Sequence, residues 1–179
     1  MKKTFIFFLF LLVTLSFNSS AQRVTNGEKY GNTLNLGLGI GGYSGYYGYI
    51  GRTLPVFHLN YEFDVVNNFT LAPFVTFYTY NQNYYRESVV PIGVKGSYYF
   101  DQILNAGSDW DFYLAGSLGF AVVNSRWDAN YMGDRGYYQR ARPLFLDLHI
   151  GTEYHFNNKI GAFLDISTGV STIGLSFHL

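Results

Sequence analysis

The feature that most constrains the fold is a two-residue alternation of apolar and polar side chains along most of the chain. Successive side chains of a β-strand point to opposite faces of a sheet, so this period predicts strands with one apolar face. It is clearest where Leu146 and Leu148 alternate with Asp147 and His149. No segment carries a sustained apolar stripe of helical period, so we expect almost no helix.

Eight alternating segments can be counted, and none of their apolar positions is charged. The apolar sets are Leu34, Leu36, Leu38 and Ile40; Phe57, Leu59, Tyr61, Phe63 and Val65; Phe69, Leu71, Pro73, Val75 and Phe77; Val90, Ile92, Val94, Gly96, Tyr98 and Phe100; Phe112, Leu114, Gly116, Leu118, Phe120 and Val122; Leu144, Leu146, Leu148, Ile150, Tyr154 and Phe156; Ile160, Ala162, Leu164 and Ile166; and Ile173, Leu175, Phe177 and Leu179.

The composition indicates that this apolar face meets lipid. Charged residues make up 13% of the chain, against about 25% in a soluble domain, while aromatic residues make up 20%. No apolar stretch reaches the roughly 20 residues of a membrane-spanning helix. A chain that crosses a bilayer without such a helix must close its sheet, because lipid satisfies no backbone hydrogen bond. We therefore predict an all-β fold, an eight-stranded antiparallel up-and-down transmembrane barrel.

The first residues are typical of a secretory signal. Lys2 and Lys3 precede a 13-residue apolar run, and Ser19, Ser20 and Ala21 follow it with the small side chains that signal peptidase needs. We therefore expect Sec-dependent export and an integral location in the outer membrane. The expected segments are a cleaved signal peptide (1–21), a short periplasmic N-terminal segment (22–32) and the barrel (33–179).

The links between the segments alternate in length, as an up-and-down barrel requires. Asn67-Asn68 and Asn157-Asn158 are expected to be tight periplasmic turns, since Asn tolerates the positive φ of a type I′ hairpin. The longer links are expected on the outer side. They are Ser44 to Arg52, Asn81 to Ser88 and Asn124 to Arg142.

Aromatic residues flank the apolar segments at both ends, which favours two interfacial belts. High strand propensity of Tyr and Phe is the alternative explanation. The belt residues are Tyr61, Phe63, Tyr98, Phe100, Tyr154 and Phe156 near the tight turns and Phe77, Tyr78 and Tyr80 near the outer loops.

The opposite face of the strands gathers ionisable residues, which an eight-stranded barrel would enclose in a lumen filled by side chains. We interpret them as a hydrogen-bonded network that closes the lumen to solutes, with a metal, proton-coupled or catalytic role as the alternative. No cofactor is expected. The network residues are His58, Glu62, Asp64, Lys95, Asp111, Asp147, His149, Glu153, His155 and Asp165, and His178 lies on the same face.

The third outer loop is 19 residues long and rich in Tyr, Trp and Arg, the residue types that dominate binding hot spots. Either this loop binds a partner, or it has no partner and its arginines only contact the phosphate groups of lipopolysaccharide. The candidate residues are Arg126, Trp127, Tyr131, Arg135, Tyr137, Tyr138, Arg140 and Arg142.

Residues 33–179 resemble the OmpA/OmpX-like family of small outer-membrane barrels, in the aromatic-rich, porin-like form common in Bacteroidota. The likeness is carried by Tyr98 to Phe100, by Trp110 to Gly116 and by the ending Ile173 to Leu179. It implies insertion by the barrel assembly machinery, although many members end in Phe where this chain has Leu179. Members include structural, adhesive and complex-associated barrels, so the resemblance implies an architecture rather than one activity.

Three functions remain open at this stage. The first is a non-enzymatic barrel that acts through its outer loops or as a subunit of an envelope complex. The second is a lipid-modifying outer-membrane enzyme, which would need a Ser and His pair at the lipid-facing rim, where no such pair is found. The third is a soluble periplasmic barrel resembling lipocalins, with its apolar face turned inward. Without Lys2 and Lys3 there remain ten basic and twelve acidic residues, with no basic cluster for nucleic acid.

Overall fold

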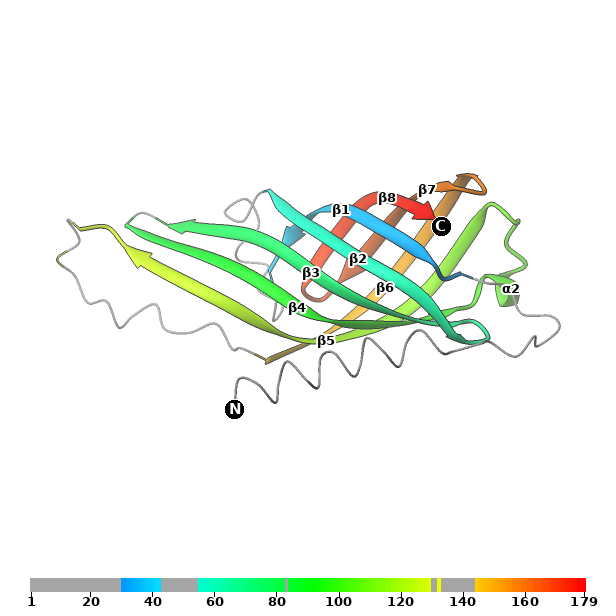
Figure 1. Cartoon of the computed structure of the whole chain (residues 1–179), viewed down its shortest axis with the longest axis horizontal. Helices are drawn as coiled ribbons and strands as arrows, with labels where there is room; N and C mark the ends of the chain where they lie inside the picture. Colours follow the sequence, from blue (N-terminus) through cyan, green and yellow to red (C-terminus); the bar gives the residue numbers. More distant parts are fainter. Residues whose placement is uncertain (1–29, 43–54, 83, 130–131, 133–143) are drawn as a thin grey trace.

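The computed structural model describes residues 30–42, 55–82, 84–129, 132 and 144–179. Eight strands follow one another around a closed barrel, and each pairs antiparallel with the next (Figure 1). The predicted fold class is therefore confirmed. The strands are β1 (Thr33–Gly41), β2 (Val56–Val66), β3 (Phe69–Gln82), β4 (Tyr85–Tyr99), β5 (Trp110–Trp127), β6 (Leu144–Asn157), β7 (Ile160–Ser167) and β8 (Val170–His178), with a short helix α2 (Asp101–Leu104) between β4 and β5.

The barrel closes where the first strand meets the last. The β1–β8 register runs without a break from Thr33 opposite His178 to Gly41 opposite Val170. A closed sheet has no edge strand, so the backbone groups of the wall are paired within it. In the part of the chain that the structure describes, no helix is long and apolar enough to cross a membrane.

The alternation places apolar side chains outside the barrel and polar ones inside. Leu146, Leu148 and Ile150 are 70%, 65% and 52% exposed, whereas Asp147 and Asp165 are buried. The other strands repeat this pattern in the predicted register, with large exposed apolar side chains on the outer face of each one. A water-soluble protein has the opposite arrangement, so the outer surface is suited to lipid.

The start of β1, the end of β8 and the β2–β3, β4–β5 and β6–β7 connections share one end of the barrel, which we name the turn end (Figure 1). Asn68 has the expected positive φ of 57°. Asn67, Asn157 and Asn158 do not have a positive φ, so the type I′ prediction, which needs it at both central residues, is wrong at both turns. Instead the Asn157 side-chain oxygen accepts hydrogen bonds from the backbone N–H groups of Lys159 and Ile160, at 2.8 and 3.1 Å. An Asn side chain that mimics a backbone turn in this way needs no left-handed residue.

At the opposite end, which we name the loop end, β3, β4 and β5 project past the other strands (Figure 1). Gln82 pairs with Tyr85, and Tyr85 pairs with Trp127, so most of the expected loop 81–88 and the start of the expected loop at Asn124 are strand. Outward-facing residues of this projection are polar, which ends the apolar alternation while backbone pairing continues. The prediction that the strands end where the apolar alternation ends is therefore wrong for β3, β4 and β5.

The aromatic belt is only partly as expected. At the turn end Tyr61, Tyr98 and Phe156 are exposed on the outer wall, and at the loop end Phe77 is exposed as well. Tyr78 and Tyr80, however, are buried, at 3% and 6% exposure, because their even positions in β3 face inward. The loop-end belt therefore depends on Phe rings and not on these two tyrosines.

Candidate functional site

The ten predicted network residues all belong to the inward-facing positions of the wall, and the lumen they line is the candidate site. The loop half of the lumen contains an apolar cluster, made of Val56, Tyr78, Val89, Ala121 and Phe145. The turn half is polar and is closed by a second cluster, made of Tyr30, Tyr99, Tyr113 and Ala115. Side chains therefore fill the barrel at both levels.

Asp165 of β7 is the centre of the middle layer. Its carboxylate forms an ion pair with the Lys95 ammonium at 3.1 Å and accepts a hydrogen bond from the Tyr113 hydroxyl at 2.8 Å. The Nδ1 atom of His149 lies 2.7 Å from the other carboxylate oxygen. Three strands besides β7 thus supply partners to one buried charge, which is what a charge in a low-dielectric interior requires.

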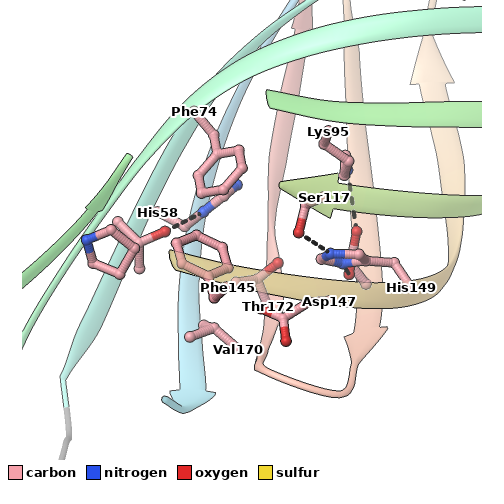
Figure 2. A pocket seen from close by; sticks show the side chains of 12 residues that line it. His58, Phe74, Lys95, Ser117, Phe145, Asp147, His149, Val170 and Thr172 are labelled. Carbon is pink, nitrogen blue, oxygen red and sulfur yellow. Dashed lines mark hydrogen bonds and ion pairs between the residues drawn. The ribbon is translucent and has the colours of Figure 1, made fainter. Parts of the chain in front are cut away.

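Ser117 extends this layer into an arrangement that resembles a catalytic triad. Its hydroxyl lies 2.9 Å from Nε2 of His149, whose Nδ1 contacts Asp165, as Figure 2 shows for the labelled serine and histidine. This pair lies in the lumen and not at the lipid-facing rim, where a lipid-modifying enzyme would need it.

The space beside Ser117 limits what that arrangement can do. The adjoining cavity has a volume of about 30 Å³, enough for about two water molecules. Its wall includes Phe74, Phe145 and Thr172 (Figure 2). An acyl substrate does not fit such a volume, and the strand amides around it are engaged in the barrel ladder. The geometry therefore favours a hydrogen-bond network over catalysis.

Glu62 of β2 organises the next layer toward the turn end. It accepts a hydrogen bond from the Tyr99 hydroxyl at 2.7 Å, a short one from the Thr70 hydroxyl, and one from the Asn35 amide at 3.4 Å. In the loop half, His58 contacts the Thr76 hydroxyl at 2.8 Å. These contacts join strands β1 to β4 across the lumen.

The turn-end layer joins two histidines to acids. His155 Nε2 lies 2.8 Å from the Asp111 carboxylate, and His178 Nε2 lies 2.8 Å from the Glu153 carboxylate. Asp64 accepts hydrogen bonds from the backbone N–H groups of Tyr30 and Gly31, at 3.1 and 3.0 Å. Asp147 lies apart, near the loop end, where the Thr168 hydroxyl donates to it at 3.3 Å.

The lumen holds more buried carboxyl groups than lysine or arginine side chains. Among the described residues seven carboxyl side chains are buried, and Lys95 is the buried lysine or arginine that faces them. The acids are Glu62, Glu87, Asp101, Asp111, Asp147, Glu153 and Asp165. Since an uncompensated buried charge is costly, the imbalance makes the lumen attractive to protons and cations.

Residues that the network prediction did not include complete the closure. Tyr30, Tyr99 and Tyr113 supply the hydroxyls that satisfy buried carboxylates. Tyr99 and Tyr113 could have been found from the inward register of β4 and β5. Tyr30 precedes the first strand, and no periodicity marks it.

The candidate partner-binding loop lies mostly outside the described residues, as Tyr131, Arg135, Tyr137, Tyr138, Arg140 and Arg142 do. Arg126 and Trp127 form the end of β5 in the projection. The Trp127 ring lies 4.8 Å from the Tyr85 ring, and the Tyr85 hydroxyl donates to Ser125 at 3.0 Å. The described part of the loop end is thus a β-sheet with aromatic side chains in contact across neighbouring strands.

Comparisons with known proteins bear on the fold. No protein-family model matches the sequence. No curated protein matches it either. Neisserial surface protein A, in its crystal structure, is similar at a TM-score of 0.52 and 14% sequence identity, over 82% of this chain and 95% of that chain. The outer membrane protein Ail of Yersinia pestis, in a phospholipid bilayer nanodisc, gives a TM-score of 0.44 at 11% identity, over 86% of this chain and 100% of that one.

The likeness to Neisserial surface protein A is a likeness of fold. It extends over nearly the whole of both chains, and the sequence identity is too low to transfer a role. Together with the closed eight-stranded sheet, it gives this chain the fold of the small outer-membrane β-barrels that its sequence resembles.

Proposed function

We propose that this protein is a non-enzymatic integral barrel of the bacterial outer membrane that does not conduct solutes and acts through its loop end. The observation that carries the proposal is the inverted wall, with exposed Leu, Ile and Phe outside and a filled polar lumen inside. Such a wall is stable in lipid and would aggregate in water. The two side-chain clusters that fill the described part of the lumen support the proposal that it does not conduct solutes.

The projecting sheet supports a role at the cell surface. If the start of β1 and the end of β8 face the periplasm, the projecting ends of β3, β4 and β5 lie on the outer side (Figure 1). Arg86 and Arg126 are exposed on this projection, so they are available to lipopolysaccharide phosphates or to a protein partner. The role in this proposal is structural, adhesive or that of an accessory subunit in an envelope complex, after insertion by the barrel assembly machinery.

Cysteine labelling tests the location and orientation directly, since the chain contains no cysteine. Ala129→Cys places a thiol on the exposed end of the projection, and Lys159→Cys places one on the exposed β6–β7 turn. On intact cells a membrane-impermeant maleimide should label the first variant and not the second. Equal labelling of both, or labelling of Lys159→Cys alone, would overturn the proposed orientation.

The arrangement of Ser117, His149 and Asp165 favours an enzyme as a second candidate, and a separate test decides it. A fluorophosphonate probe reacts with serines that are activated by a neighbouring base. We expect no labelling of the folded barrel, because the cavity beside Ser117 is too small for the probe. Labelling that disappears in Ser117→Ala would favour the enzyme.

The lipocalin-like alternative is not favoured. It needs the apolar set to line the interior, whereas Leu36, Leu118 and Ile173 are about half exposed on the outside. The described interior offers a mixed, nearly filled cavity in place of a lipid pocket.

A further inference from the structure

We propose that Glu153, His155 and His178 form a binding site for one divalent transition-metal ion at the turn end of the lumen. One ligand atom from each of these residues lies within 4.8 Å of the others. The inference goes beyond the proposed function, since a barrel that acts through its loops does not require it.

The hydrogen bonds around His178 fix which ring nitrogen faces Glu153. The Thr33 hydroxyl donates its single proton to the carbonyl oxygen of Tyr30, at 3.2 Å. It therefore accepts from Nδ1 of His178, at 3.0 Å. In the neutral imidazole the lone pair is then on Nε2, which lies 2.8 Å from the Glu153 carboxylate oxygen. Two acceptors face each other, so a positive charge belongs between them.

His155 is oriented in the same way by a second acid. Its Nε2 lies 2.8 Å from an Asp111 carboxylate oxygen, which can only accept. The lone pair is then on Nδ1, at 3.9 Å from the same Glu153 oxygen. A carboxylate that holds the far nitrogen of a histidine is the usual support of a metal-ligating ring. Asp111 and Thr33 thus direct both rings toward one point.

Gly161 has no side chain, and this leaves room for the Glu153 carboxylate beside His178. Glu153 is on β6 and His178 is on β8, and β7 lies between these strands. Gly161 of β7 pairs with His155 on one side and with Ser176 on the other. The Glu153 carboxylate lies over Gly161, in the space that a Cβ atom would fill. Any larger residue at this position would push the carboxylate away from His178.

The distances suit a first-row divalent ion. Bonds of about 2.0–2.1 Å in a tetrahedral arrangement place ligand atoms about 3.4 Å apart. The two contacts of Glu153, at 2.8 and 3.9 Å, lie on either side of that value. Two imidazoles with one carboxylate favour Zn²⁺ or a neighbouring transition metal over Ca²⁺ or Mg²⁺, which prefer oxygen ligands.

The site is also accessible and electrostatically favoured. The side chains of His155 and His178 are 21% and 19% exposed, so water can reach a fourth coordination position from the turn end. The buried excess of carboxyls stabilises a dication there. In the orientation proposed above, this mouth of the barrel opens to the periplasm.

Titration of the tag-free full barrel in detergent with zinc chloride, followed by calorimetry, tests the site. We expect one saturable Zn²⁺ per barrel and zinc-edge X-ray absorption that shows two imidazole nitrogens. His155→Ala and His178→Ala should each weaken binding at least tenfold. Asp111→Asn, which touches no metal directly, should weaken it about 10- to 100-fold through the orientation of His155.

His58→Gln is the matched control, because it removes a lumen histidine that lies in the loop half and should leave the affinity unchanged. Heat modifiability on a denaturing gel verifies that each variant is folded. If an alanine variant is not folded, Glu153→Gln is tested in its place and should also weaken binding. Absence of saturable binding to the folded wild type would overturn the proposal and leave a shared proton between His178 and Glu153. Equal affinity in folded His155→Ala and His178→Ala would overturn it too.

Discussion

The ring of Tyr30 stacks on the ring of Tyr99, with centroids 3.9 Å apart and planes 8° apart. The Tyr30 hydroxyl donates to the Asp101 carboxylate at 3.1 Å, which ties the segment before β1 to helix α2. A residue outside the barrel wall thus closes the turn end of the lumen. The segment before Thr33 is part of the folded unit at least from Tyr30 onward.

Removal of the Tyr30 ring should destabilise the barrel. We expect Tyr30→Ala to cost about 3 kcal/mol, as loss of a packed aromatic side chain does. Tyr30→Phe keeps the stack and loses the hydrogen bond to Asp101, so about 1–2 kcal/mol is expected. Urea unfolding of the barrel in lipid vesicles measures both. Equal stability of Tyr30→Ala and the wild type would show that the stack does not close the lumen.

Two glycines of the wall should differ in how much stability the same substitution removes. The Tyr113 ring lies over Gly151 at the place where a Cβ atom would be, whereas a Cβ at Gly116 would meet nothing within 4 Å. Gly151→Ala must displace the ring from Asp165, and we expect a loss of about 1–3 kcal/mol. Gly116→Ala should change stability by less than about 0.5 kcal/mol. Similar effects of the two substitutions in urea unfolding would contradict this packing.

The buried ion pair predicts a non-additive pair of substitutions. Lys95→Met leaves the Asp165 carboxylate buried without its ammonium, and we expect a loss of about 3–5 kcal/mol. Adding Asp165→Asn should recover part of that loss, because no charge is then left unpaired. Lys159→Met, at an exposed turn position, is the control and should have little effect. A double variant as unstable as the sum of the single ones would exclude coupling.

The registers of the strands could be predicted because each one has a face that meets a different solvent. A shift by one residue would put Asp147 or Lys95 on the outside, so the alternation leaves one choice. The strand ends were not predictable in this way. Beyond Val122 the outward face of β5 is polar, so Asn124 and Arg126 no longer distinguish strand from loop.

The lumen set could be predicted from the register, and its pairing could not. Side chains from β6 and β8 meet across Gly161, and contacts of this kind depend on the twist and closure of the whole sheet. The contact between Ser117 and His149 likewise depends on the register of β5 against β6, which the sequence alone does not supply. Tyr78 and Tyr80 face inward, as their even positions in β3 require, so the aromatic-belt prediction is wrong for these two residues.

The outer wall predicts a depth-dependent cost of charge. Leu148 is 65% exposed between Leu146 and Ile150 on the apolar outer face of β6, and Leu148→Arg should cost about 2–4 kcal/mol in a bilayer. Asn124→Arg introduces the same side chain on the projection, where water solvates it, and should cost less than about 1 kcal/mol. Unfolding in vesicles measures both. Equal costs would mean that Leu148 does not face lipid.

Heat modifiability in the native membrane tests the central claim most directly. Outer-membrane fractions are extracted in detergent and run unboiled and boiled on a denaturing gel. We predict a band that migrates faster when unboiled, found with the outer membrane and absent from the soluble periplasm, because a closed barrel resists unfolding by detergent. Recovery in the soluble periplasm without detergent, with a single band under both conditions, would contradict a barrel whose apolar wall faces lipid.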